Sequence, residues 1–358
     1  MNITKKNKIL TLETLRGLAA VCVALYHYPS TSFLFFRNGY QGVYFFFILS
    51  GFIISLNYSD KIINFKDLIN FQVKRFYRLY PLHFVTLFLV LFIQIIKYFL
   101  IKYSSLDHGL NDVARWHSFK DFVGNLLLIQ SVFKDFYIFS WNGVSWSISA
   151  EFYTYIIFGF LFLIFKKYKF FAIVVFTYII YIILHIDYFS SAKIFNDQFF
   201  LCIYNFSLGY FGYCLYARIK FRLNNFIGIF FAISLLAVKI YYENIFYQYK
   251  EYFFLLIILF AAMLKNNTII YKFLNLKPLV FLGTISYSFY LIHQIAVYLF
   301  VQFCKFIIKI NFIKDINGNT SNTGNIYYDT LIHLGYISLS IFLAYFLHKY
   351  IELKYRKK

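Results

Sequence analysis

Residues 12–28, LETLRGLAAVCVALYHY, are apolar enough to lie in a membrane-spanning helix, yet they include Glu13, Arg16 and His27. Each ionisable side chain near the centre of a bilayer costs roughly 2.5–3.5 kcal/mol on insertion scales. A span that carries such residues is therefore expected to use them, either for contacts inside the protein or for chemistry.

Apolar stretches recur along the whole chain and predict a polytopic membrane protein. Of its 358 residues, 61% are hydrophobic and 14% are charged, and the mean hydropathy is +0.64. Runs of about 20 apolar residues can cross roughly 30 Å of hydrocarbon. We predict an all-α membrane helix bundle of about ten transmembrane helices, near 9–28, 39–57, 79–103, 144–165, 170–186, 199–217, 225–242, 251–264, 280–304 and 329–350.

The chain is expected to form a single integral-membrane domain over residues 1–358, without a cleavable signal peptide, because no A-x-A-type site follows the first apolar stretch. Its cysteines also lie in apolar stretches and lack the spacing of metal ligands, so no metal site is predicted. These cysteines are Cys22, Cys202, Cys214 and Cys304.

The formal net charge of +20 comes mainly from short basic clusters between the apolar runs. They include KKNK (5–8), KRFYR (74–78), KKYK (166–169), RIKFR (218–222) and KYRKK (354–358), and they recur at every second loop between the predicted spans. The positive-inside rule places such loops in the cytoplasm, so both termini are predicted to be cytoplasmic. We interpret the charge as a topology signal facing anionic membrane lipid, and we predict no nucleic-acid partner.

Arg16 and His27 are 11 positions apart, which is about three turns of an α-helix. They are therefore expected on one helix face, displaced along the axis by about 16 Å. This stripe would carry a fixed cation near the inner end of the span and a titratable base near the outer end. Snorkelling of each side chain to its nearer interface is the alternative.

Two further stretches combine apolar residues with groups that a span does not need. GYQGVYFFFILSGFIIS (39–55) contains Gly39, Gly42, Ser50 and Gly51, which favour close helix packing. FQVKRFYRLYPLHF (71–84) contains an Arg-x-x-Arg pair on one helix face at the inner membrane surface. Guanidinium groups so placed can bind phosphate in a bidentate manner, although topology alone would also supply arginines there.

The remaining two stretches place polar groups within spans. SWSISAEFYTYIIF (145–158) contains Glu151, expected in the outer half of its span near the level of His27, where the two could act as base and orienting group. A structural pair with a neighbouring His or Arg is the alternative. LGTISYSFYLIHQ (282–294) aligns Ser286, Tyr290 and His293 on one stripe, which interhelical hydrogen bonding would also explain.

Together and in this order, the five stretches resemble the acyltransferase-3 family of bacterial integral-membrane acyltransferases. ETLRG is similar to the family's DGLRG element, and Arg16 and His27 have its Arg-x10-His spacing. GVYFFFILSGF is similar to the family's GVDLFFVLSGF element, and Arg75 and Arg78 precede YP as in its Arg-x-x-Arg element. Further along the chain, WSISAEFYTY is similar to WSLxxExxFY, and SYSFYLIH is similar to SYSxYLxH. The resemblance extends over residues 9 to about 295. Tyr44 departs from it, since the family element has Asp at this position.

The resemblance implies a membrane O-acyltransferase that moves an acyl group, commonly acetyl from cytoplasmic acetyl-CoA, onto a hydroxyl of a cell-surface glycan or lipid-linked sugar. The chain would then lie in the bacterial inner membrane and act on a polysaccharide such as O-antigen or lipopolysaccharide. His27 would be the general base or a transient acyl carrier, and Glu151 would support it. The acetyl-CoA, or another acyl-CoA, would be bound by Arg16, Arg75 and Arg78. Supporting positions in the same motifs are Glu13, Ser50, Tyr287 and His293.

A transporter or flippase for a lipid-linked glycan is the alternative from another functional class. In such a protein the intramembrane charges would line a substrate path. Transporters of this kind often contain two-fold repeats, and the sequence shows no internal repeat, so the acyltransferase is the favoured interpretation.

Overall fold

The computed structural model describes residues 9–28, 38–103, 118–185, 194–241, 245, 248–313 and 323–356. Within these ranges the regular structure is helical, apart from two isolated β-bridges, Phe133–Phe195 and Leu223–Leu264. The fold is therefore all-α, as predicted. The α-helices are α1 (Leu10–Tyr26), α2 (Gly42–Tyr58), α3 (Phe65–Tyr103), α5 (Phe119–Leu126), α6 (Trp146–Phe165), α7 (Lys169–His185), α8 (Asp197–Arg218), α9 (Asn225–Tyr241), α11 (Lys250–Met263), α12 (Ile269–Leu274), α13 (Lys277–Phe303), α14 (Ile326–Leu347) and α15 (Leu353–Arg356).

Short segments of other helix types connect or extend these helices. Three 3-10 turns precede α2, α6 and α7, and π-helical turns follow α13 and α14. Their bounds are η2 (Gly39–Gln41), η3 (Gly143–Ser145), η4 (Lys166–Tyr168), η6 (Cys304–Ile308) and η7 (His348–Glu352).

Each predicted span coincides with a helix, and six helical stretches of the described residues are long and apolar enough to cross a membrane. They are Gly39–Tyr58, Phe65–Leu100, Gly143–His185, Asp197–Arg218, Lys277–Ile308 and Ile326–Tyr355. The third contains both α6 and α7, which are separated by a turn at Lys166 (φ 39°) and pack against each other. Large apolar side chains such as Phe171 (70% exposed) and Phe226 (81% exposed) cover the outside of the bundle, as lipid contact requires. The protein is therefore a multi-pass membrane protein.

The basic segment KRFYR (74–78) was expected between two spans, but it lies inside α3. That helix has 39 residues and is about 58 Å long, whereas the hydrocarbon layer is roughly 30 Å thick. The helix is thus much longer than the hydrocarbon layer is thick, so one α-helix can contain both a membrane span and the basic segment.

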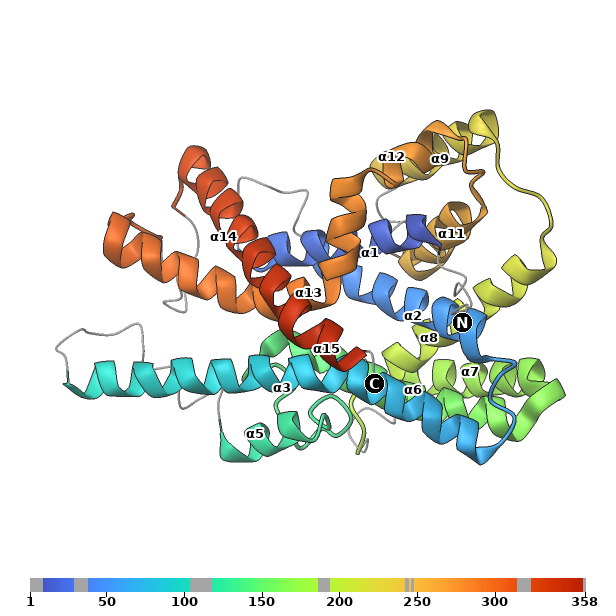
Figure 1. Cartoon of the computed structure of the whole chain (residues 1–358), viewed down its shortest axis with the longest axis horizontal. Helices are drawn as coiled ribbons and strands as arrows, with labels where there is room; N and C mark the ends of the chain where they lie inside the picture. The colour runs from blue at the N-terminus through green and yellow to red at the C-terminus, as the bar shows by residue number, and fades with distance from the viewer. Residues whose placement is uncertain are drawn as a thin grey trace.

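Glycine contacts bring the central helices close together. α1 packs against α13 and α2 packs against α8 (Figure 1). A Cβ at Gly17 would collide with the backbone of Gly283, and a Cβ at Gly51 would collide with the backbone of α8 near Phe206. The close packing expected for the glycines of 39–55 is thus present at Gly51, and the Gly17–Gly283 contact sets the α1–α13 distance on which the site depends.

Candidate functional site

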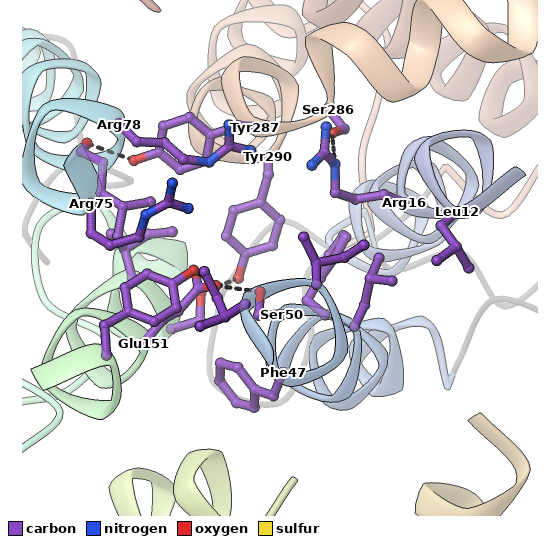
Figure 2. Close-up of a pocket in the computed structure, with 18 of the residues that line it drawn as sticks. Leu12, Arg16, Phe47, Ser50, Arg75, Arg78, Glu151, Ser286, Tyr287 and Tyr290 are labelled. Carbon is purple, nitrogen blue, oxygen red and sulfur yellow. Dashed lines mark hydrogen bonds between the residues drawn. The ribbon is translucent and has the colours of Figure 1, made fainter. Parts of the chain in front are cut away.

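A cavity of about 240 Å³ lies between α1, α2, α3, α6 and α13. Apolar side chains such as Leu12, Phe47 and Ile148 form part of its wall. Its charged lining residues are Glu13, Arg16, Arg75, Arg78 and Glu151, each of which the sequence had indicated. Figure 2 shows Arg75 and Arg78 on one side of the cavity and Arg16 on the other.

Arg16 is held inside the bundle by α13. Its Nε donates to Ser286 Oγ at 2.8 Å, and its terminal nitrogen donates to the Gly283 carbonyl at 2.9 Å. A carboxylate oxygen of Glu13, one turn earlier, lies 3.6 Å from the same guanidinium. Because these partners belong to the protein core, the position of Arg16 does not depend on snorkelling to an interface.

Arg75 is surrounded by aromatic rings. Its guanidinium carbon lies 5.3 Å from the centroid of Tyr58 and 5.9 Å from those of Phe71 and Tyr155. One terminal nitrogen donates to the Tyr58 hydroxyl at 3.3 Å. Its Nε is buried and has no hydrogen-bond partner among the described residues. The stacking fixes the guanidinium plane and leaves a buried donor for an anionic ligand.

Arg78, one helical turn after Arg75, also lines the cavity. No described residue accepts a hydrogen bond from its guanidinium or lies within ion-pair distance of it. The next residue along α3 is tied to α13, because the Tyr287 hydroxyl donates to the Leu79 carbonyl at 2.6 Å. Arg78 is thus a half-buried cation whose hydrogen-bond donors are available to a ligand.

Glu151 joins α6 to α2. Its carboxylate accepts hydrogen bonds from Ser50 of α2 and from Tyr155, one turn later in α6. Tyr155 was not identified from the sequence, although its i,i+4 spacing from a buried acid is the signal that would have found it. These two contacts fix the Glu151 carboxylate in the wall of a cavity that also contains arginines.

His27 and His293 form a second polar group, at the far end of α1. His27 follows the last residue of α1, and its Nδ1 lies 2.8 Å from the Val23 carbonyl. His293 Nδ1 lies 2.6 Å from the Tyr290 carbonyl, and its Nε2 lies 3.2 Å from His27 Nδ1. His293 is fully buried, whereas His27 is partly exposed.

These carbonyl contacts assign the tautomers, since a carbonyl oxygen can only accept. Each ring therefore carries its proton on Nδ1 when it is neutral, and His293 Nε2 accepts from the shared Nδ1 proton of His27. The second nitrogen of His27, Nε2, then has a free lone pair. No described residue lies within hydrogen-bond distance of it. His27 is thereby arranged to accept a proton from a bound molecule.

The expected pairing of His27 with Glu151 does not form. Glu151 lies with the arginines and is hydrogen-bonded to Ser50 and Tyr155, whereas His27 contacts His293. The depth of a residue in its span does not predict its contact partner, because the rotation of each helix about its axis decides which neighbouring side chain it contacts. The two polar groups are instead linked through α13.

Tyr290 provides that link between the cavity and the histidines. Its hydroxyl lies in the cavity lining, 2.8 Å from Ser147 Oγ, and its carbonyl accepts from His293. Ser286, one turn earlier in α13, binds Arg16. The polar stripe of residues 282–294 therefore contacts both ends of the polar face of α1.

Comparison with known proteins gives one family match. Residues 9–349 match the family model described as an acyltransferase domain, of the acyltransferase-3 type. Searches of curated proteins and of solved structures returned no significant match. The family match covers nearly the whole chain, including every residue of the cavity and both histidines.

Proposed function

The chain belongs to the acyltransferase-3 family, and on that premise we propose that it is an O-acyltransferase with acetyl-CoA, or another acyl-CoA, as donor and a hydroxyl of a cell-surface glycan or lipid-linked sugar as acceptor. The observation that carries the proposal is that α1 contributes Arg16 to the cavity and His27 to the histidine pair, while α13 holds both. A single helix face thus connects a cationic cavity to a base.

The cavity is the proposed donor site. An acyl-CoA is polyanionic, and guanidinium groups bind phosphate through charge-assisted, bidentate hydrogen bonds. The arginine side chains of the cavity fit such an anionic ligand. Arg75 has a buried Nε without a described hydrogen-bond partner, and the guanidinium of Arg78 makes no hydrogen bond to a described residue. The apolar wall of Leu12, Phe47 and Ile148 suits the uncharged arm of the donor.

His27 is the proposed base. A hydroxyl of the acceptor would give its proton to His27 Nε2 as its oxygen attacks the thioester carbonyl carbon. The carbon–sulfur bond then breaks, the acyl group remains on the acceptor oxygen, and the proton passes to the departing thiolate of CoA. In the variant with an acyl carrier, His27 Nε2 itself attacks the thioester carbonyl carbon, the carbon–sulfur bond breaks, and CoA leaves as its thiolate. The acceptor hydroxyl then takes the acyl group from the acyl-imidazolium, and its proton passes by way of the freed imidazole to the CoA thiolate.

The role that we propose for Glu151 differs from the one expected from the sequence. Because it is bound to Ser50 and Tyr155 beside the arginines, we assign it to the donor site and not to the orientation of His27. His293 is the group that orients His27, through the contact between their ring nitrogens.

We propose that the protein lies in the inner membrane of a bacterium and has ten spans, with both termini in the cytoplasm. α1 begins and α2 ends beside the donor cavity, where Ile9 and Asn57 line it. With a cytoplasmic N-terminus, the cavity would face the compartment that supplies acyl-CoA. The histidine pair would face the side on which O-antigen or another polysaccharide is built.

Radiolabelled acetyl-CoA given to the purified protein, with lipid-linked sugars extracted from the native membrane, tests the function. We expect label in the sugar fraction and free CoA in proportion to it. Transport of a lipid-linked glycan without any acylated product would support the transporter or flippase instead and would refute the proposal.

A further inference from the structure

A buried carboxylate in the first turn of α14 is not used by the proposed mechanism. Asp329 is fully buried, and its Oδ1 accepts hydrogen bonds from the Tyr28 hydroxyl at 3.0 Å, the Thr323 backbone N–H at 3.0 Å and the Thr323 hydroxyl at 2.9 Å. A carboxylate that is removed from water needs donors of this kind. The five motif stretches end at residue 294, so none of them includes this group.

One of the three donors belongs to the residue that directly follows the proposed base. α1 ends at Tyr26, His27 is its C-cap residue, and Tyr28 is the next residue. The ends of helices fray unless tertiary contacts hold them. Tyr28 is only 3% exposed, so the chain just beyond α1 is fixed in the protein core.

The Tyr28 ring also packs against other residues of α14. It meets the His333 ring edge to face, with centroids 4.9 Å apart, and its centroid lies 6.1 Å from that of Tyr336. The Tyr336 hydroxyl in turn donates to the Ala24 carbonyl at 3.3 Å, and the same carbonyl accepts the His27 backbone N–H at 3.1 Å. α14 therefore holds the chain on both sides of His27, three residues before it and directly after it.

We propose that Asp329 is a positioning residue for acyl transfer, which anchors Tyr28 and thereby fixes the backbone that carries the His27 ring. The inference rests on the role proposed for His27. The contacts of the ring with the Val23 carbonyl and with His293 set its rotation, whereas the Tyr28 anchor sets where the end of α1 lies. This matters for the rate, because a displacement of about 1 Å can cost on the order of 100-fold.

The test is steady-state acyl transfer by the full-length protein in detergent, together with calorimetric binding of acetyl-CoA. Tyr28→Phe removes only the hydroxyl and leaves Asp329 with both contacts to Thr323. We expect kcat to fall by about tenfold, while the acetyl-CoA affinity and the number of binding sites per protein stay within about twofold. A residue that only stabilised the fold would instead lower the number of binding sites and leave kcat per site unchanged.

Asp329→Asn extends the test to the carboxylate itself. It keeps the shape of the side chain and removes its charge, and we expect a loss of kcat similar to that of Tyr28→Phe. Because Asp329 acts through Tyr28, the double variant should lose no more than about twofold beyond the larger single loss. Losses that multiply would overturn the inference, as would an unchanged kcat in Tyr28→Phe.

Tyr204→Phe is the matched control. The Tyr204 hydroxyl lies 3.1 Å from the Tyr252 hydroxyl and joins α8 to α11, so the variant loses a phenol contact between two helices other than α1 and α14. Its kcat should stay within about twofold of that of the unmodified protein. An equal loss in Tyr204→Phe and Tyr28→Phe would contradict a specific role of the Asp329 contact.

If Tyr28→Phe does not fold, Thr323→Ala decides the question, because it removes one of the hydrogen bonds that hold the Asp329 carboxylate. A lower kcat at unchanged acetyl-CoA affinity supports the positioning role, and an unchanged kcat excludes it. An unmodified protein that transfers no acyl group would refute the proposed function itself. An active protein whose Tyr28→Phe variant is equally active would refute the inference alone.

Discussion

His27 and His293 meet with their ring centroids 4.8 Å apart and their planes inclined at 67°, so that Nε2 of the buried ring faces Nδ1 of the partly exposed one. The two residues come from α1 and α13, at opposite ends of the chain. Both hydrogen-bond contacts of the His27 ring are made by Nδ1, so its Nε2 has no hydrogen-bond partner among the described residues. The contact with His293 makes that residue the one on which the orientation of His27 depends.

His27→Asn should reduce turnover by at least about 100-fold while acetyl-CoA binding stays near that of the unmodified protein, because general acid–base catalysis contributes on this scale. The measurement is labelled acyl transfer alongside calorimetric binding. His185→Asn is the matched control: His185 also bonds the carbonyl one turn earlier, with its Nδ1 2.9 Å from Tyr181, but it is exposed and lies outside the site. An active His27→Asn enzyme would end the catalytic assignment.

A label-trapping experiment can distinguish the two roles proposed for His27. If the imidazole carries the acyl group, labelled acyl should remain on the denatured protein when acceptor is withheld, and His27→Asn should abolish this label. If the imidazole acts only as a base, no label should be trapped in either protein.

Arg75→Lys should raise the KM for acetyl-CoA by about tenfold with a smaller change in kcat, because lysine keeps the charge but loses the planar fork and its stacking on Tyr58. Lys74→Ala, an exposed neighbour in the same basic segment, serves as the control and should leave the KM unchanged. If Arg75→Ala and Arg78→Ala both leave the dependence of rate on acetyl-CoA intact, these arginines are topology signals only.

Ser50→Ala should lower the thermal stability of the protein in detergent. The substitution leaves the Glu151 carboxylate with Tyr155 as its one described donor, and a lost hydrogen bond to a charged group costs about 1.5–3 kcal/mol. Ser234→Ala on α9 is the comparison, since Ser234 is only partly buried and its one side-chain hydrogen bond in the structure is to the Phe230 carbonyl. Equal melting temperatures for the two variants would mean that Glu151 does not need the Ser50 contact.

Gly17→Ala should reduce the yield of folded protein, because the added methyl group would collide with the backbone of Gly283 and force α1 away from α13. Gly228→Ala on α9 should be neutral or stabilising. Its methyl group would meet only ordinary van der Waals contacts, and alanine favours a helix over glycine by about 0.8–1 kcal/mol. Size-exclusion profiles of the two variants make the comparison, and a well-folded Gly17→Ala protein would contradict the close α1–α13 contact.

Single cysteines introduced into residues 311–328 should react with a membrane-impermeant reagent in intact cells, whereas a cysteine at Tyr168 should react only after lysis. The native cysteines would first be replaced. This pattern follows from ten spans with cytoplasmic termini. Residues 314–322 lie outside the described part of the structure, so the labelling would test the sequence-based topology independently. Labelling of 311–328 only after lysis would invert the assignment.

The amino-acid sequence by itself determined the properties that depend on local composition. The apolar run lengths predicted a helix at each span, the basic clusters predicted a topology, and the motifs indicated every charged residue that lines the cavity. These features can be predicted from the sequence because the length of an apolar run and the charge of a loop determine how the segment interacts with lipid and water. These interactions do not depend on which helix lies next to it.

Only the tertiary structure decided which of these residues meet. His27 contacts His293 and not Glu151, and Ser50 and Tyr155 hold Glu151. Such partnerships depend on the rotation of each helix about its axis and on the distance between axes. Contacts such as Gly17 against Gly283 set both, and they join residues that are distant in the chain.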